Sequence, residues 1–578
     1  MKMKSGILLF IFLNFMIMAQ DKDEPWFFDE AEKAINKENY EYALSILNEG
    51  KNSFPLSYRI KEKIGDLYFD KSLYSMALES YREGEILEPD NGSIIYKIGS
   101  TLGRLNENDQ AILYYEKLVA YEDYKRIAID DLSWLYYKVH RLKDSEKLLL
   151  DEINESFHRN LAITLGTVYS EMYNYEKSKE YYLLSIEDAR EKNARYFASV
   201  ALYNLSLLEY SFYNYEQSLK YTEESLDSQD RSSGHLARGE ILQLAGRYRE
   251  AKQEYMKAES LDDTPLSRIA LAGLYQKAGH LDEALAYMND VLSRRDMSWM
   301  YFFGTDKNNY AMDLSRPLSA LYKAMASYER SRLYYSFPEW VRGKINQITY
   351  SVKSFYQEQL YKKSARIVGD NNSGKSEFNS WWAYSRAAMG NEPVFMKYIK
   401  LCEAFEKELT SKSVPWYLLE KGREQSDYDM LNEALPLFRG DWEAEPIMET
   451  LENLIKLEDR KNSVARRKRL NDLYFLNNGA LMQNGLYLPL ILEHNGLGSE
   501  RRLKKYLEET GSEVSLNSDE GFSYKLIIKI ENSSYSWFLL SPDGEILHEN
   551  KNTYEKLNSR TYKEITMSVF DTMYRYSF

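Results

Sequence analysis

The sequence predicts a mainly α-helical protein: a solenoid of antiparallel helix pairs followed by a small C-terminal α/β domain. Two observations predict this fold. Small residues recur every 34 residues through the first half of the chain, and after residue 477 the pattern changes to short strands and helices. A fixed period of this length is typical of stacked helical hairpins. The chain has 578 residues, more than one hydrophobic core usually serves, so several regions are expected.

The first 19 residues predict a signal peptide. Lys2 and Lys4 precede an apolar run at residues 6–18, and Ala19 is a small residue suited to cleavage. The run is shorter than a comfortable membrane span, and no later stretch is long and apolar enough to cross a bilayer. We therefore expect an exported bacterial protein of the periplasm or cell envelope, with no integral membrane span after signal cleavage. Retention of the segment as an uncleaved anchor is the alternative.

Residues 20–296 contain the repeat. Its alanines are Ala43, Ala77 and Ala111. Gly65 and Gly99 lie 12 residues before the second and third of these alanines. Small side chains at these positions allow two antiparallel helices to approach closely, while bulky neighbours at helical spacing fill the ridges and grooves. Because one such hairpin cannot bury its apolar face alone, the unit must repeat.

This pattern resembles the tetratricopeptide repeat (TPR). Later copies at Leu165–Tyr169 and Leu271–Tyr275 keep the register, and we count about eight units over residues 24–296. Serine replaces alanine at three of the small positions: Ser145, Ser178 and Ser218. The resemblance implies a curved stack whose first helices line a concave groove, and a scaffold that holds other proteins rather than an enzyme.

The TPR register projects eight side chains toward that groove. They are Arg59, Glu62, Asp66, Phe69, Tyr96, Arg104, Asp130 and Tyr137. This mixture of charged and aromatic groups suits a peptide or helix of a partner protein bound in the groove. It does not reproduce the Lys/Asn carboxylate clamp of chaperone-binding TPR domains. A solvated face without a ligand is the alternative.

Two further regions follow the repeats. Residues 297–477 keep a helical pattern, punctuated by prolines, and are expected to continue the solenoid as irregular hairpins. Residues 478–578 predict a small α/β domain, with strands at 487–493 and 522–530, a helix at 499–509, a hairpin turning at Asp543-Gly544 and a final helix at 561–574. This element order resembles the α/β domains of TolB amino-terminal and curli-secretion type, which implies envelope or outer-membrane assembly components as partners.

Charge and residue usage exclude several functions. The net charge of −14 argues against a nucleic-acid partner, and the basic run Arg466–Arg469 is expected to be a solvated helix face. The single cysteine, Cys402, cannot form an internal disulfide. The six histidines are scattered singly, so no metal site and no cofactor are predicted.

One motif offers an alternative function. Gly369–Ser376 reads G-x4-G-K-S, the spacing with which a phosphate loop binds nucleotides. No buried strand precedes the segment, so a polar loop between helices is the expected structure. We therefore expect an exported protein-interaction scaffold in envelope assembly, with no enzymatic activity, and keep a nucleotide-binding protein as the alternative. The sequence names neither the partner nor the oligomeric state.

Overall fold

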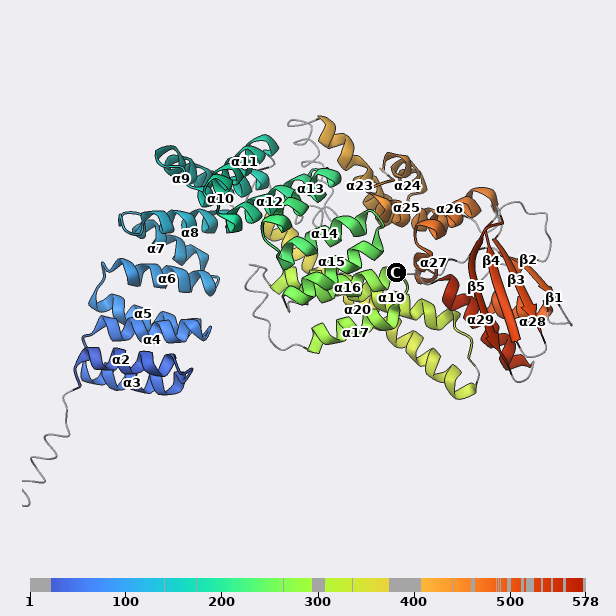
Figure 1. The fold of residues 1–578 in the computed structure, drawn as a ribbon, viewed down its shortest axis with the longest axis horizontal. Coiled ribbons are helices and arrows are strands. Elements are labelled where there is room, and N and C mark those ends of the chain that lie inside the picture. The colour runs from blue at the N-terminus through green and yellow to red at the C-terminus, as the bar shows by residue number, and fades with distance from the viewer. Residues whose placement is uncertain are drawn as a thin grey trace, which may run out of the picture. The chain divides into compact units, whose positions relative to one another are not determined.

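The structure is a computed structural model (Figure 1). It describes residues 22–574 with the exception of residues 140, 173, 263–264, 294–306, 335, 374–406, 439, 459–462, 485, 487, 489, 496–499, 511–513, 516–523, 532–533, 542–543 and 555–557. The chain divides into two compact units, one ending at Val168 and one beginning at Tyr169. The predicted signal peptide, residues 1–19, lies outside the described residues.

The helices of the first unit pair in chain order, as the period of 34 predicts. They are α2 (Glu24–Ile35), α3 (Tyr40–Ser53), α4 (Tyr58–Asp70), α5 (Tyr74–Leu87), α6 (Gly92–Arg104), α7 (Asn108–Leu118), α8 (Lys125–Lys138) and α9 (Leu142–Glu155), and α10 (Arg159–Glu171) begins in this unit. Asn39, Ser57 and Asn91 each accept a backbone N–H in the first turn of the helix that follows. These side chains satisfy amide groups that have no partner within the helix.

The small residues of the repeat lie where the two helices of a pair meet. Ala77 and Ala111 are fully buried. The ring of Tyr81 on α5 lies directly over Gly65 on α4, where a Cβ atom would overlap it. The spacing argument is therefore confirmed: the glycine leaves the room that the aromatic ring of the partner helix fills.

Serine at the alanine position adds a hydrogen bond to this packing. The hydroxyl of Ser145 donates to the carbonyl of Ser133 at 2.9 Å, and that of Ser218 donates to the carbonyl of Ser206 at 2.7 Å. Both hydroxyl groups are buried, so each needs a partner inside the protein. The small side chain keeps the packing, and its hydroxyl ties the second helix to the backbone of the first.

The second unit also begins with helices that pair in chain order. Its helices are α11 (Tyr175–Glu191), α12 (Arg195–Ser211), α13 (Tyr215–Ser228), α14 (Ser232–Leu244), α15 (Tyr248–Leu261), α16 (Pro265–Lys277) and α17 (Leu281–Ser293). Within this unit α12 pairs with α13, α14 with α15 and α16 with α17. Helices α11 and α12 are the longest of these, with 17 residues each.

Irregular helices follow, as the proline-punctuated pattern predicts. They are α19 (Lys307–Ser331), α20 (Phe337–Ser373), α23 (Lys407–Gln425), α24 (Tyr428–Ala434), the 3-10 turn η1 (Leu435–Leu437), α25 (Ala444–Leu457), α26 (Ser463–Leu476) and α27 (Asn478–Gln483). The basic run on α26 differs from the expected solvated face. Arg466 is buried, and Arg469 forms an ion pair with Glu458 and donates to Asn432, because α26 packs these side chains against neighbouring elements.

The chain ends in a mixed sheet covered by helices. Its elements are β1 (Leu490–Asn495), α28 (Glu500–Glu509), β2 (Val514–Ser515), β3 (Tyr524–Ile530), β4 (Ser534–Leu540), β5 (Ile546–Thr553) and α29 (Ser559–Met573). The strand order is β2-β1-β3-β4-β5, with β1 parallel to β2 and β3 and the other pairs antiparallel. The predicted α/β order is confirmed, and the two-residue strand β2 is an addition to it.

One hydrophobic core joins the late repeats to this sheet. It extends from Leu242 on α14 through Leu321 on α19 and Leu451 on α25 to Trp537 on β4 and Phe570 on α29. Trp537 donates its ring N–H to Ser568 of α29 at 3.2 Å. The core is continuous across positions 296 and 477, where the sequence pattern changes.

Polar contacts reinforce this junction. Asn477 is buried and donates to the carbonyl of Lys277, at the end of α16, at 2.9 Å. Asn478 donates to the carbonyl of Met573, at the end of α29, also at 2.9 Å. The short helix α27 therefore connects the last repeat to the last helix of the chain.

Candidate functional site

The predicted groove residues lie on the first helices of successive repeats. Three neighbouring helices of the first unit, α4, α6 and α8, contribute all eight of them. Side chains link α4 to α6 and α6 to α8, so these helices form one continuous face, which we call the inner face. All eight residues thus lie on three successive first helices, and their contacts differ.

At the junction of α4 and α6 a lysine joins two of the predicted carboxylates. The Lys97 ammonium lies 2.7 Å from Glu62 and 2.8 Å from Asp66. Ser93 also donates to Glu62, at 2.5 Å, and the Tyr81 hydroxyl donates to Asp66 at 2.9 Å. Burial lowers the pKa of Lys97, but the hydrogen bonds and charges of the two carboxylates outweigh it and raise the pKa above its usual value. Glu62 and Asp66 therefore tie consecutive repeats together.

Arg59 and Phe69 pack against aromatic rings of neighbouring helices. The Arg59 guanidinium lies 5.1 Å from the ring centre of Phe28 on α2, within the range of a cation–π contact. The Phe69 ring meets Tyr74 of α5 edge-on at 5.3 Å. Both side chains remain partly exposed, so they border the inner face while also holding its helices in place.

The junction of α6 and α8 is richer in accessible aromatic and cationic groups. Trp134 and Tyr137 stack with ring centres 4.9 Å apart, and Trp134 is 44% exposed. Arg104 at the end of α6 is exposed, and its charge lowers the pKa of the partly buried Lys138 on α8, after the larger effect of burial. Neither cation forms an ion pair within the part of the chain that the structure describes.

Two neighbouring aspartates on α8 have raised pKa values. Burial raises the pKa of Asp130, against hydrogen bonds from Thr164 and Asn160 and the charge of His158. Burial also raises the pKa of Asp131 to about 6, opposed by a hydrogen bond from Tyr115. Asp130 therefore links α8 to α10 within the first unit, through a hydroxyl contact of 3.5 Å from Thr164.

Sequence reasoning missed Lys97, Asp131, Trp134 and Lys138. The register could have found two of them, because Trp134 lies 68 residues, or two periods, after Asp66, and Lys138 lies 34 after Arg104. The roles of Lys97 and Asp131 follow only from their neighbours in space. The ring of Tyr96 on α6 contacts the ring of Tyr115 edge-on, with ring centres 6.1 Å apart.

The phosphate-loop match falls partly in a helix. Residues 369–373 belong to the last turn and a half of α20, whereas the expected structure was a polar loop. The remaining residues of the motif, Gly374, Lys375 and Ser376, lie outside the described residues. In a phosphate loop the residues after the first glycine leave regular secondary structure so that their amide groups can surround the phosphates.

The fold is a TPR-like array of helix pairs. Residues 92–123 and 233–265 match the tetratricopeptide repeat family, and the first of these matches contains α6 and α7. The chain therefore contains tetratricopeptide repeats. Among the described residues no helix has both the length and the hydropathy needed to cross a membrane.

Three known proteins similar to this chain in sequence or structure are described as TPR proteins. The chain is 24% identical over 267 residues to the TPR repeat-containing protein MJ1428 of Methanocaldococcus jannaschii, covering 45% of this chain and only 40% of that relative. A tetratricopeptide repeat protein from Parabacteroides merdae aligns with 43% of this chain and 97% of its own, at 16% identity and a TM-score of 0.38. YrrB, described as a TPR protein with an unusual peptide-binding site, aligns with 30% of this chain and 90% of its own, at 17% identity and a TM-score of 0.26.

Proposed function

We propose that this chain is an exported scaffold that binds a segment of a partner protein on the inner face, at the junction of α6 and α8, in the assembly of the bacterial cell envelope. The observation that carries the binding site is the exposed Trp134–Tyr137 stack beside Arg104 and Lys138. An aromatic platform next to two cations without ion-pair partners suits an acidic segment, because such a segment supplies carboxylates and apolar side chains together.

The first unit offers two different surfaces for this role. At the α4–α6 junction the charged groups satisfy one another through Lys97, so a ligand there would have to displace existing ion pairs. At the α6–α8 junction the cations have no such partners among the described residues. We therefore place the partner on the second surface and assign the first a structural role.

Site-specific photo-crosslinking in cells tests the binding site. A benzophenone amino acid replaces Tyr137, and a matched variant carries it at Tyr42, which is 46% exposed on α3. We expect a discrete crosslinked partner from position 137 that is absent from position 42 and is lost in the Arg104→Glu/Lys138→Glu variant. Identical adducts from both positions, or an adduct that survives the double charge reversal, would rule out this site.

Export and the envelope role rest on the charged and apolar segment at residues 1–19 and on the resemblance of the C-terminal element order to envelope-assembly domains. Cell fractionation with amino-terminal sequencing of the mature protein tests the first point. We expect the chain to start near Gln20 and to fractionate with the envelope. A full-length protein in the cytoplasm would contradict export, and partners without envelope function would contradict the assembly role.

We also propose that the protein works by binding and not by catalysis. Calorimetry with Mg-ATP tests the nucleotide-binding alternative at Gly369–Ser376, with Lys375→Ala as the matched variant. We expect no saturable heat from either protein. Saturable binding that the substitution abolishes would replace the scaffold hypothesis with the phosphate-loop one.

A further inference from the structure

Helix α20 has an apolar stripe that is largely exposed in the described structure. Its exposed large side chains recur at intervals of three and four residues, which places them on one face of the helix. The stripe consists of the exposed residues Phe337, Ile345, Ile348, Val352 and Phe355 and of Val341, which is partly exposed. Four of its members, Ile345, Ile348, Val352 and Phe355, are each 58–65% exposed.

The opposite face of α20 is already packed. Ser354 exchanges hydrogen bonds with Ser319 of α19, and Tyr350 stacks on Tyr322 of α19 with ring centres 6.2 Å apart. Gly343 lies against the ring of Tyr334, where a Cβ atom would overlap it. The helix is therefore fixed in orientation by α19, and the stripe faces outward.

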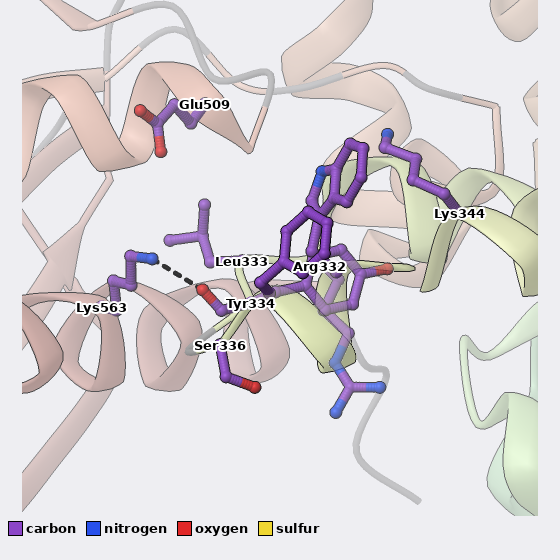
Figure 2. A pocket seen from close by; sticks show the side chains of 9 residues that line it. Arg332, Leu333, Tyr334, Ser336, Lys344, Glu509 and Lys563 are labelled. Atoms are coloured by element: carbon purple, nitrogen blue, oxygen red, sulfur yellow. Dashed lines mark hydrogen bonds between the residues drawn. The ribbon is translucent and has the colours of Figure 1, made fainter. Parts of the chain in front are cut away.

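A pocket lies at the N-terminal end of the stripe (Figure 2). Its volume is about 470 Å³. Its lining residues are Arg332, Leu333, Tyr334, Ser336, Phe337, Trp340, Lys344, Glu509 and Lys563. Phe337 and Trp340 stack with ring centres 5.8 Å apart, and Phe337 belongs to the stripe, so the pocket and the stripe form one surface.

This surface is cationic in an acidic protein. Arg332, Lys344 and Lys563 line the pocket against a single carboxylate, Glu509. None of the three cations forms an ion pair with another described residue, although Lys563 donates to the carbonyl of Tyr334 at 2.6 Å. Along α20, residues 340–357 include Arg342, Lys344 and Lys353 but no aspartate or glutamate. The chain as a whole carries a net charge of −14.

We propose that the α20 stripe and the pocket at its end form a second docking surface, which binds an amphipathic helix of another protein through the apolar face of that helix and acidic residues beside it. The stripe extends over 18 residue intervals, roughly 27 Å at 1.5 Å per residue, which matches a helix of about five turns. Apolar anchors at helical spacing fit the stripe, and carboxylates of the same helix meet the three cations.

The charges favour this occupant over a second copy of the chain. Two α20 stripes packed together would bring the Lys344 of each copy to the same interface, and residues 340–357 contain no aspartate or glutamate to neutralise them. The surface lies entirely in the second unit, so the proposal is independent of the inner face and of the function proposed for it.

Peptide binding to the full mature chain tests the proposal. The probe is a fluorescent 18-residue peptide with leucines at helical spacing and glutamates elsewhere, and its matched control has lysines in place of the glutamates. We expect saturable binding of the acidic peptide, followed by fluorescence anisotropy, and at least about tenfold weaker binding of the basic one. Equal binding of the two peptides would overturn the proposal.

Variants locate the site. Ile348→Asp should weaken binding of the acidic peptide by about tenfold or more, and so should Lys344→Glu. The matched control is Ile86→Asp, because Ile86 is 78% exposed on α5 in the other unit, and it should leave binding unchanged. Binding that survives Ile348→Asp and Lys344→Glu would refute the site.

Three further measurements separate other occupants. Light scattering that shows a dimer converted to a monomer by Ile348→Asp would assign the stripe to a second copy. Sedimentation with phosphatidylglycerol vesicles that depends on Ile348 would assign it to a membrane surface. The rate of maleimide labelling of a Cys402→Ser/Ile348→Cys protein should equal that of a Cys402→Ser/Ile86→Cys protein. Slower labelling at position 348 alone would show that another part of the chain covers the stripe.

Discussion

At Lys97, one ammonium group serves two carboxylates of the preceding repeat. Its side chain is 26% exposed, and those of Glu62 and Asp66 are 16% and 31% exposed. Solvent therefore screens the pairs only in part, and removal of the cation leaves two neighbouring like charges. Individual side chains of this kind decide which parts of the inner face are available to a partner.

We expect Lys97→Met to destabilise the first unit by about 1–2 kcal/mol, because it leaves Glu62 and Asp66 without a counter-charge. The measurement is hydrogen exchange of α4 and α6 followed by mass spectrometry. Lys143→Met is the control, since its ion pair with Glu146 is formed by a lysine that is 78% exposed, and it should have little effect. Equal effects of the two substitutions would show that the Lys97 pairs add nothing.

Asp131 gives the first unit a pH dependence. Its pKa rises from the usual 3.8 to about 6 in the folded protein. A carboxyl with a raised folded-state pKa contributes its stabilisation below pH 3.8, and the contribution is lost as the pH rises through 6. Asp131→Asn should therefore protect α8 from hydrogen exchange at pH 7.5 relative to the unmodified protein, and the protection should shrink at pH 5. A difference that does not change with pH would contradict the assignment.

At the scale of one helix pair, a small residue sets the distance between the helices. The ring of Tyr81 lies over Gly65 in the pair α4/α5, and its hydroxyl continues to Asp66. In α6, Gly103 has no atom within 4 Å of the position of a Cβ. Gly65 is therefore required for close packing of a helix pair, whereas Gly103 is not, although both lie in first helices of successive repeats.

We expect Gly65→Ala to destabilise the α4/α5 pair by about 1–3 kcal/mol, because the methyl group displaces the Tyr81 ring. Gly103→Ala should be neutral or stabilising by up to about 1 kcal/mol, since alanine favours the helix and meets no neighbour. Thermal unfolding with exchange-detected localisation measures both. A loss of stability at position 103 as large as that at position 65 would refute the packing argument.

At the scale of the whole molecule, the C-terminal helices and sheet pack against the last repeat within the second unit. Asn477 donates to Lys277 at the end of α16 and accepts from the amide of Gly479 at 3.0 Å. The side chain of Gln483 donates to the same Lys277 carbonyl at 2.9 Å. A terminal repeat exposes an apolar face unless something covers it, and here α27, α29 and the sheet share its core.

Asn477→Ala should destabilise the second unit by about 1–3 kcal/mol, because it leaves the Lys277 carbonyl and the Gly479 amide with fewer partners in a buried place. Exchange should increase in α16 and α27 and stay unchanged in residues 22–168. Asn453→Ala is the control, since Asn453 donates only to Glu449 of its own helix, at 2.7 Å. Increased exchange in the first unit would contradict the division into two units.

Local patterns alone determined the helical array and the order of the C-terminal elements. The intervals between Gly65, Ala77 and Ala111 predict the helix pairs because packing of neighbouring helices repeats with the chain, and alternation predicts β3 and β4 because successive strand side chains face opposite sides. The same register selected the eight groove residues, which lie on α4, α6 and α8.

Only the tertiary structure decided what each of those residues does. Lys97 forms ion pairs with Glu62 and Asp66, and Arg466 is buried. The stripe of α20 is exposed, although its apolar residues have the spacing of a buried helix face. Each outcome depends on which residues, distant in the sequence, pack against the side chain in the folded protein. The local sequence pattern does not determine those neighbours. The same spacing of apolar residues buries one helix face in a core and leaves another open to a partner.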